Sequence, residues 1–287
     1  MRGLLALVAL VLALTAAACG GSGAGSSDSS SASSTTPAGE TSSSESAQSL
    51  VAAAGAKTSE AESARISFTA TFTGATSGSM DGEGVFAQRR GHLTMDMSAL
   101  IGTASGPGQA EIIFDKLVYY MKLPASAGAP LPPGKEWFKI DLAKLGETQG
   151  LDLEQLTQLN QSDPSQALDF LRGASSDFRE VGTEQVRGED TTHYAGTIDL
   201  DKVAADAPPD VAEQYRKVAE LSPSKKVPME VWVGDDGLVR RIRFKQTLPG
   251  GSTMMMDEEL YDYGTSADVS APPEDTVVDL TALMGQS

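Results

Sequence analysis

The sequence predicts an α+β fold, in which a strongly curved antiparallel β-sheet of about ten strands carries about three helices over its concave apolar face. Apolar and polar residues alternate with a period of two along most of the chain after residue 50, and Gly-rich turns separate the alternating segments. The spacing becomes helical in the middle of the chain. A sheet of about ten strands must curl strongly or close. Helices that are apolar on one side only belong on the apolar face of such a sheet.

The first 18 residues have the features of an export signal. Arg2 is followed by an uninterrupted apolar stretch over residues 4–14, and small side chains occupy residues 15–18. The apolar stretch is too short for a membrane span, which needs roughly 20 apolar residues. Cys19, the only cysteine, comes next and is followed by Gly and Ser, so the segment resembles the lipobox of bacterial lipoproteins. An ordinary secretory signal with a stray thiol is the alternative.

The lipobox resemblance implies that acyl chains such as palmitate are attached to Cys19. It places the mature chain, lipid-anchored, at the extracytoplasmic face of the cell membrane. Residues 20–49 are almost wholly Ser, Gly, Ala and Thr, with no aromatic or branched aliphatic residue. Such a segment cannot bury enough apolar surface to offset its ordering entropy. We therefore predict a signal peptide over residues 1–18, a lipidated and disordered tether over 19–49, and one folded domain over 50–287.

The strong acidity of the chain excludes some partners. The net charge is −17, and it becomes −18 once Arg2 leaves with the signal. This charge argues against binding to nucleic acid and against electrostatic docking on anionic lipid. A single cysteine also leaves no partner for an intramolecular disulfide.

The predicted strands follow the alternating pattern. They span residues 65–73, 80–86, 92–97, 110–114, 117–121, 137–140, 178–186, 192–198, 227–233, 238–248 and 253–263. We expect one long antiparallel meander with a continuous apolar face. Helices are expected at Leu151–Leu159, after the capping sequence that begins at Asp163, and after Pro208-Pro209-Asp210.

The last two strands allow their register to be predicted. A short loop at Pro249-Gly250-Gly251 would pair Phe244 with Met256, Arg243 with Asp257, and Arg241 with Glu259. Apolar residues then meet on one face and opposite charges on the other. Glu258 is the exception, since it is an acid on the apolar face. The preceding hairpin is expected to set Val233, Met229 and Val227 against Leu238, Ile242 and Phe244.

Catalytic and metal-binding patterns are weak. The two histidines, His92 and His193, are far apart and lack the spacing of a zinc site. The Gly-rich stretch 82–87 mimics a dinucleotide fingerprint, but it lies between strands instead of opening a helix. Asp199 and Asp201 suit a helix cap better than a metal pair. We therefore predict no enzyme, no catalytic residue, no metal and no cofactor.

The apolar face is rich in Met, a residue that adaptable binding surfaces use heavily. Gly82 and Gly84 lie on the same face, where missing side chains would leave room above the sheet. A filled core, with glycines that ease curvature, is the alternative reading. By face parity the candidate lipid-binding residues are Phe68, Phe72, Met80, Gly82, Gly84, Met95, Met97, Ile112, Phe114, Tyr119, Met121, Tyr194, Ile198, Met229, Val231, Ile242, Phe244, Met254 and Met256.

Three segments resemble an actinobacterial lipoprotein family in their order and spacing. They are residues 186–199 (VRGEDTTHYAGTID), residues 231–241 (VWVGDDGLVRR), and YDYG at 261–264 followed by VSAPP at 269–273. They are similar to the LppX/LprA/LprF/LprG family. The resemblance implies a half-barrel of the LolA/LolB type that encloses an apolar cavity for acyl chains.

The resemblance also implies a function in the cell envelope. It predicts a lipoprotein that binds acyl lipids or lipoglycans and helps to move them across the envelope. The expected partners are that lipid, the cell membrane through Cys19, and, as a further candidate, a membrane transporter. The alternative is a non-catalytic envelope sensor or scaffold that binds a protein partner.

Overall fold

The computed structural model describes residues 40–74, 77–87, 90–101, 108–124, 131–148, 177–207, 212–248, 250–266 and 269–281. The signal peptide, Cys19 and the two helices expected between residues 151 and 171 lie outside these ranges.

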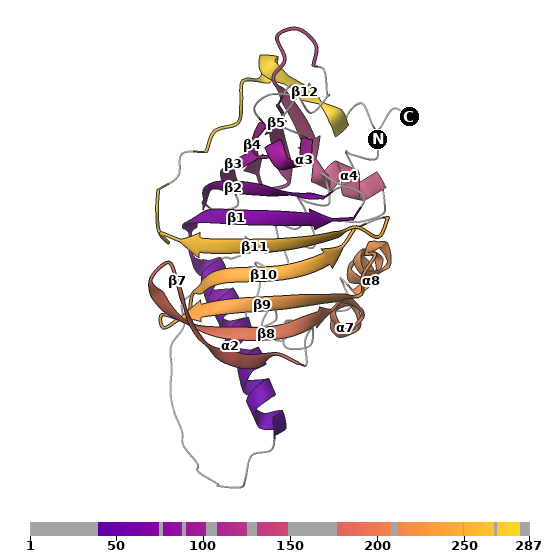
Figure 1. Cartoon of the computed structure of the whole chain (residues 1–287). Coiled ribbons are helices and arrows are strands. Elements are labelled where there is room, and N and C mark those ends of the chain that lie inside the picture. The colour runs from indigo at the N-terminus through magenta and orange to yellow at the C-terminus, as the bar shows by residue number, and fades with distance from the viewer. Residues whose placement is uncertain are drawn as a thin grey trace.

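A single sheet of twelve strands dominates the described structure (Figure 1). Its strands are β1 (Ser63–Thr73), β2 (Gly78–Ala87), β3 (Arg90–Asp96), β4 (Gln109–Asp115), β5 (Val118–Lys122), β6 (Trp137–Asp141), β7 (Arg179–Val186), β8 (Glu189–Asp199), β9 (Lys226–Gly234), β10 (Val239–Thr247), β11 (Thr253–Tyr261) and β12 (Val277–Asp279). The sheet is strongly curved and stays open, with β12 and β7 as its edges. The predicted fold class is therefore confirmed.

The strand order differs from the single meander expected from the sequence. The order is β12-β6-β5-β4-β3-β2-β1-β11-β10-β9-β8-β7, so two meanders meet where β1 pairs with β11. Ile66 lies opposite Leu260, and Phe72 lies opposite Met254. This pairing of apolar residues between distant segments joins the two halves on one face. The short β12 was not expected, and it runs parallel to β6.

The predicted register of the last hairpin is confirmed. Phe244 pairs with Met256, Arg243 with Asp257, and Arg241 with Glu259. The register expected for the preceding hairpin is wrong, because Phe244 lies opposite Met229 instead of Val227. The shift of two residues arises in two places: Val233 already faces Val239 instead of Leu238, and an irregularity between Val239 and Arg241 adds the second residue, as a β-bulge does.

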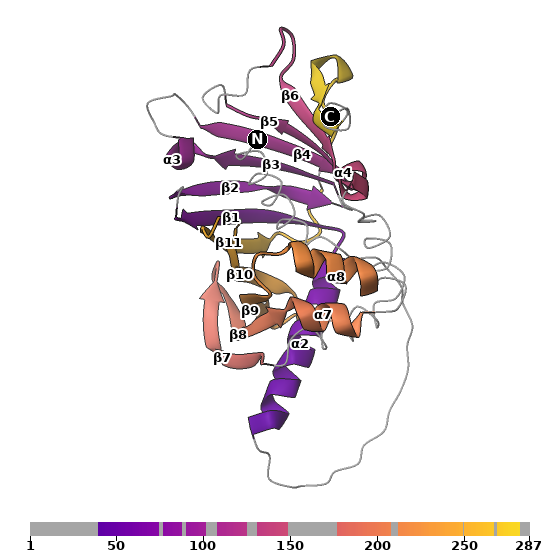
Figure 2. The ribbon, with the colours of Figure 1, turned by 90° about the vertical axis from the view of Figure 1, so that its right-hand side faces the viewer.

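Five α-helices and one short 3-10 helix accompany the sheet in the described ranges: α2 (Glu40–Glu60), α3 (Ser98–Ile101), α4 (Leu142–Thr148), α7 (Leu200–Asp206), α8 (Ala212–Leu221) and η4 (Glu274–Thr276). Asp199 caps α7 as expected, accepting hydrogen bonds from the backbone N–H groups of Asp201 and Lys202 at 3.1 and 3.3 Å. Helix α8 follows the Pro-Pro-Asp sequence as expected, and Figure 2 shows it beside α7.

Helix α2 begins inside the segment predicted as a tether. It contacts β7, β9 and β10, and Figure 1 shows it lying across this half of the sheet. Ala47 and Ala54 are buried in the core that it shares with the sheet. Its C-terminal turn is also held, because the backbone N–H of Val239 donates to Thr58 Oγ1 at 2.8 Å. Small side chains allow this close approach, whereas the composition of residues 40–49 suggested disorder.

Candidate functional site

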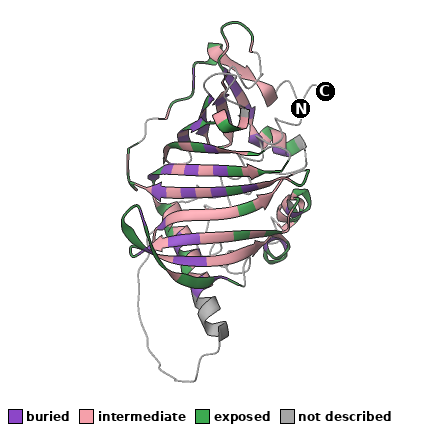
Figure 3. Ribbon diagram, viewed as in Figure 1, coloured by how far each residue is buried: buried purple, intermediate pink, exposed green. Residues whose placement is uncertain are grey.

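The predicted ligand-binding residues gather on one face of the sheet. Burial alternates along β1, β3 and β11, as Figure 3 shows, and the buried positions belong to one core. The buried candidates are Phe68, Met80, Met95, Met97, Ile112, Phe114, Tyr119, Met121, Tyr194, Val231, Met254 and Met256. The alternation of apolar and polar residues along each strand therefore predicted correctly that these side chains share one face.

The remaining five apolar candidates are only partly buried: Phe72, Ile198, Met229, Ile242 and Phe244. We call these five residues the half-buried patch. Phe244 lies opposite Met229 on the neighbouring strand. Ile198 lies next to Asp199, the N-cap of α7, and α7 and α8 lie at this end of β8, β9 and β10 (Figures 1 and 2). The apolar face thus combines a closed part with a part that retains accessible apolar surface.

The room expected above Gly82 and Gly84 is already occupied. A Cβ atom on Gly82 would overlap the Phe68 ring and lie 2.9 Å from the carbonyl oxygen of Thr94. On Gly84 it would overlap the carbonyl oxygen of His92 and lie 2.6 Å from Leu93 Cδ2. The expectation of open space at these two positions is therefore wrong. Here glycine permits close approach of a neighbouring ring and strand.

An acidic side chain lies within the apolar face. Glu258 on β11 is 2% exposed, and its neighbours across the ladders are Phe68 and Ile242. Its Oε1 atom has no hydrogen-bond partner. Burial raises the pKa of the Glu258 carboxyl to about 7. The sequence marked this residue as an exception to the alternation, but it was not among the predicted site residues.

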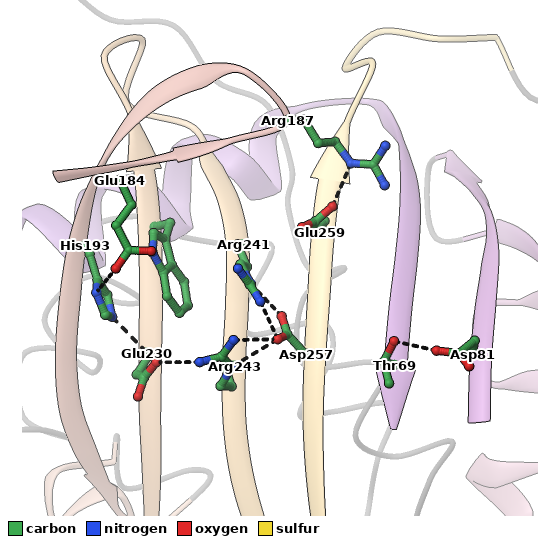
Figure 4. Close-up of polar contacts among 11 residues, drawn as sticks. Thr69, Asp81, Glu184, Arg187, His193, Glu230, Arg241, Arg243, Asp257 and Glu259 are labelled. Carbon is green, nitrogen blue, oxygen red and sulfur yellow. Dashed lines mark hydrogen bonds and ion pairs between the residues drawn. The ribbon is translucent and has the colours of Figure 1, made fainter. Parts of the chain in front are cut away.

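The opposite face of the sheet carries a polar network around a buried tryptophan (Figure 4). Trp232 is 1% exposed, stacks on the His193 ring at 4.1 Å between centroids, and donates from Nε1 to Glu184 Oε2 at 3.2 Å. The guanidinium groups of Arg241 and Arg243 lie 4.9 and 5.4 Å from the ring centroid. Cations over an indole face are favourable contacts. Sequence reasoning assigned this face to solvent, so it missed the network.

The hairpin of β7 and β8 folds over this network. Glu184 on β7 reaches both Trp232 and His193, whose Nδ1 lies 3.1 Å from Glu184 Oε1. At the turn, Arg187 Nε donates to Glu259 Oε2 at 2.7 Å, and Nη2 donates to Ser67 Oγ at 2.7 Å. These contacts join the hairpin to β11 and β1. Only the curvature of the sheet brings them together.

The two histidines lie apart, and the described residues form no cluster that could bind a metal ion. His92 lies beside Glu111, with Nε2 2.7 Å from Oε1, and is separate from the network of His193. In the ranges that the structure covers, no group of three His, Cys, Asp or Glu side chains is arranged to hold a metal ion. None of the helices in those ranges has the length and apolar character needed to cross a membrane.

Comparison with known proteins gives one sequence relative and several similar structures. No family model matches the sequence. A Streptomyces griseus protein, described as an uncharacterized 31.2 kDa protein in the rplA-rplJ intergenic region, is 30% identical over 199 residues. The match covers 66% of this chain and 63% of that protein, so the chain spans less than two thirds of its relative's length.

The crystal structure of the Mycobacterium tuberculosis lipoprotein LppX is similar, with 15% identity and a TM-score of 0.44 over 79% of this chain and 96% of LppX. LprF from Mycobacterium bovis gives 14% identity and a TM-score of 0.42 over 79% and 97% of the two chains. The chain resembles LppX and LprF.

Proposed function

We propose that the protein is a non-enzymatic lipoprotein that binds acyl lipids or lipoglycans on its concave apolar face and helps to move them across the cell envelope. The observation that carries this proposal is the half-buried patch. Five aromatic or aliphatic side chains, predicted as ligand contacts, lie at one end of a continuous apolar face and remain partly accessible. The LppX-type resemblance of the sequence motifs supports the same function.

The half-buried patch supplies the driving force for binding. An acyl chain that lies against Phe244, Met229 and Ile198 removes its own apolar surface and theirs from water. Each buried CH₂ group contributes about 0.8 kcal/mol. Transfer between a bilayer and such a face is passive, because both environments remove comparable apolar area from water. No covalent chemistry is needed.

The proposed anchor keeps the patch close to the membrane. Acylation of Cys19 would attach the mature chain to the membrane by its first residue. Since α2 begins at Glu40, the tether shortens to residues 20–39, with a root-mean-square reach of about 25 Å. The acidic surface discourages adhesion to anionic lipid, so the anchor supplies the attachment.

Mass spectrometry tests the proposal most directly. The chain is exported behind a generic secretory signal, with Cys19→Ser so that it is released from the membrane, and is purified from the extracytoplasmic fraction without detergent. Organic extracts are then compared with those of a Phe244→Asp variant, in which a charge occupies the half-buried patch. We expect stoichiometric acyl lipid with the wild-type chain and a marked loss with the variant. Lipid-free wild-type chain that co-purifies with a protein would support the scaffold alternative.

A further inference from the structure

Glu258 is out of place in an otherwise apolar surface. Its neighbours along β11 on the same face, Met256 and Leu260, are 0% and 1% exposed. Phe68 on β1 and Ile242 on β10 face it across the two ladders. The carboxyl therefore lies among apolar side chains, and on one side it adjoins Ile242 of the half-buried patch.

One oxygen of the carboxyl group is not satisfied by the protein around it. Oε1 is buried and has no hydrogen-bond partner, and no Lys, Arg or His among the described residues forms an ion pair with Glu258. Buried polar groups are nearly always hydrogen-bonded, since an unmet donor or acceptor keeps its full desolvation cost. A buried acceptor without a partner, next to a candidate ligand surface, marks a place for a polar group of the ligand.

We propose that Glu258 is a specificity-determining residue that accepts a hydrogen bond from a hydroxyl group of the bound amphiphile. This inference rests on the proposed lipid-binding function. The acyl chain would lie along the half-buried patch, and Ile242, a member of that patch, is the direct cross-strand neighbour of Glu258. The ligand class is thus a neutral amphiphile with a hydroxyl group near its chain.

Two other ligand chemistries fit this position less well. A phosphate or carboxylate headgroup would place like charges together at low dielectric, which is unfavourable. An ammonium group would require a second buried charge, and the desolvation of two ions can exceed their attraction. The raised pKa of Glu258 agrees with surroundings that do not stabilise charge. A hydroxyl group avoids both costs and supplies the missing donor.

The test uses two probes that differ by one donor, oleyl alcohol and oleyl methyl ether. Binding to the mature chain is measured at pH 8 by competition with a fluorescent acyl probe. At this pH the carboxyl is mainly ionised and only accepts hydrogen bonds. We expect the wild-type chain to bind the alcohol about tenfold more tightly than the ether.

Variants assign this preference to the carboxyl group. Glu258→Met should bind both probes equally, and Leu260→Met, a matched change at a buried position on the same strand and face, should keep the tenfold preference. Glu258→Gln should retain only a few-fold preference, because a neutral amide forms a weaker hydrogen bond. If Glu258→Met does not fold, the Glu258→Gln variant still tests whether the preference for the alcohol depends on the carboxyl group.

The outcomes separate the inference from the proposed function. Equal binding of the two probes by the wild-type chain, or an unchanged preference in Glu258→Met or Glu258→Gln, overturns the role of Glu258 and leaves lipid binding intact. Failure of the wild-type chain to bind the fluorescent acyl probe itself overturns the proposed lipid-binding function, and the role of Glu258 with it. An acyl probe that binds but is displaced by neither the alcohol nor the ether overturns the role of Glu258 alone.

Discussion

Arg243 faces Asp257 across the ladder of β10 and β11, with Nη2 and Nε at 2.8 and 3.0 Å from Oδ2. Asp257 also accepts two hydrogen bonds from Arg241, at 2.6 and 2.5 Å. The backbone register sets Arg241 opposite Glu259, yet its side chain leans diagonally to Asp257. Glu259 is instead bound by Arg187. One carboxylate thus serves two arginines.

Because Arg241 and Arg243 share Asp257, mutation of the aspartate and mutation of one arginine should lower stability by different amounts. Asp257→Ala should destabilise the fold more than Arg243→Ala, because the first change removes the acceptor that both guanidinium groups share and leaves Arg243 only the 3.4 Å contact of Nη1 with Glu230 Oε2. The coupling between Arg243 and Asp257 in a double-mutant cycle should be about 0.2–1 kcal/mol, since both side chains are partly exposed. Urea unfolding at low salt measures it. Zero coupling would contradict the observed pairing.

Glu258 should make stability depend on pH. Its folded pKa of about 7 lies above its ordinary value of 4.5, so the folded state holds the proton more tightly. Stability is therefore highest below about pH 4.5, falls as pH rises, and reaches its full loss above pH 7. Glu258→Gln removes this loss. Relative to the wild-type chain, the free energy of unfolding of the variant should rise by on the order of 3 kcal/mol between pH 4.5 and pH 8.

Denaturant unfolding at a series of pH values checks this prediction. The neutral variant Met254→Leu serves as the control, because it should follow the wild-type pH profile. A parallel profile for Glu258→Gln and wild type would show that Glu258 does not titrate differently in the folded state.

Gly84 should not tolerate a side chain. Because a Cβ atom there would overlap the His92 carbonyl and crowd Leu93, Gly84→Leu should cost roughly 1–3 kcal/mol. Glu83→Ala, on the exposed face of the same strand, should have little effect. Thermal melting compares the two variants. A Gly84→Leu chain as stable as the wild type would show that open space exists above this strand after all.

Phe244 and Met256 are cross-strand neighbours, and variants of the two residues should distinguish lipid binding from core packing. Met256 is fully buried and Phe244 is half-buried. Met256→Ala should cost about 2–5 kcal/mol. Phe244→Ala should cost less but reduce lipid loading of the purified chain. If lipid loading falls in proportion to the loss of stability in both variants, the half-buried patch has no binding role separate from packing.

Membrane attachment should depend on Cys19. Cys19→Ser leaves no thiol to acylate, so the chain should move from the membrane fraction to the soluble extracytoplasmic fraction with its fold intact. A generic secretory signal replaces residues 1–18 in the serine variant only, so that an uncut signal cannot retain that chain, whereas the Cys19 control keeps its own residues 1–18 and with them the lipobox. Fractionation with immunodetection gives the result. Continued tight membrane association of the serine variant would contradict the lipoprotein assignment.

Local patterns were enough to predict much of the sheet. The period-two alternation placed Met80, Met95, Met121, Met254 and Met256 on one buried face, because successive side chains of a strand point to opposite sides. The last hairpin could also be registered, since a one-residue slip would have moved every apolar side chain to the wrong face. These inferences use only neighbours along the chain or across one short loop.

Contacts between distant segments could not be predicted in the same way. The pairing of β1 with β11 joins residues almost 200 positions apart, and many pairings of alternating strands satisfy the same pattern. Helix α2 gains its stability from contacts with β7, β9 and β10, which its Ser- and Ala-rich sequence does not indicate. The bulge near Arg240 likewise shifted a register that the alternation alone would have set differently.

Alternation along the chain was enough to assign side chains to the apolar face and to single out Glu258, which interrupts it. How those positions are filled depends on packing in three dimensions. Phe68 and Leu93, the cross-strand neighbours of Gly82 and Gly84, fill the space above these glycines, and curvature carries the β7–β8 hairpin over Trp232. Alternation reports on which side of a strand a residue lies, whereas curvature and long-range packing decide what lies above it.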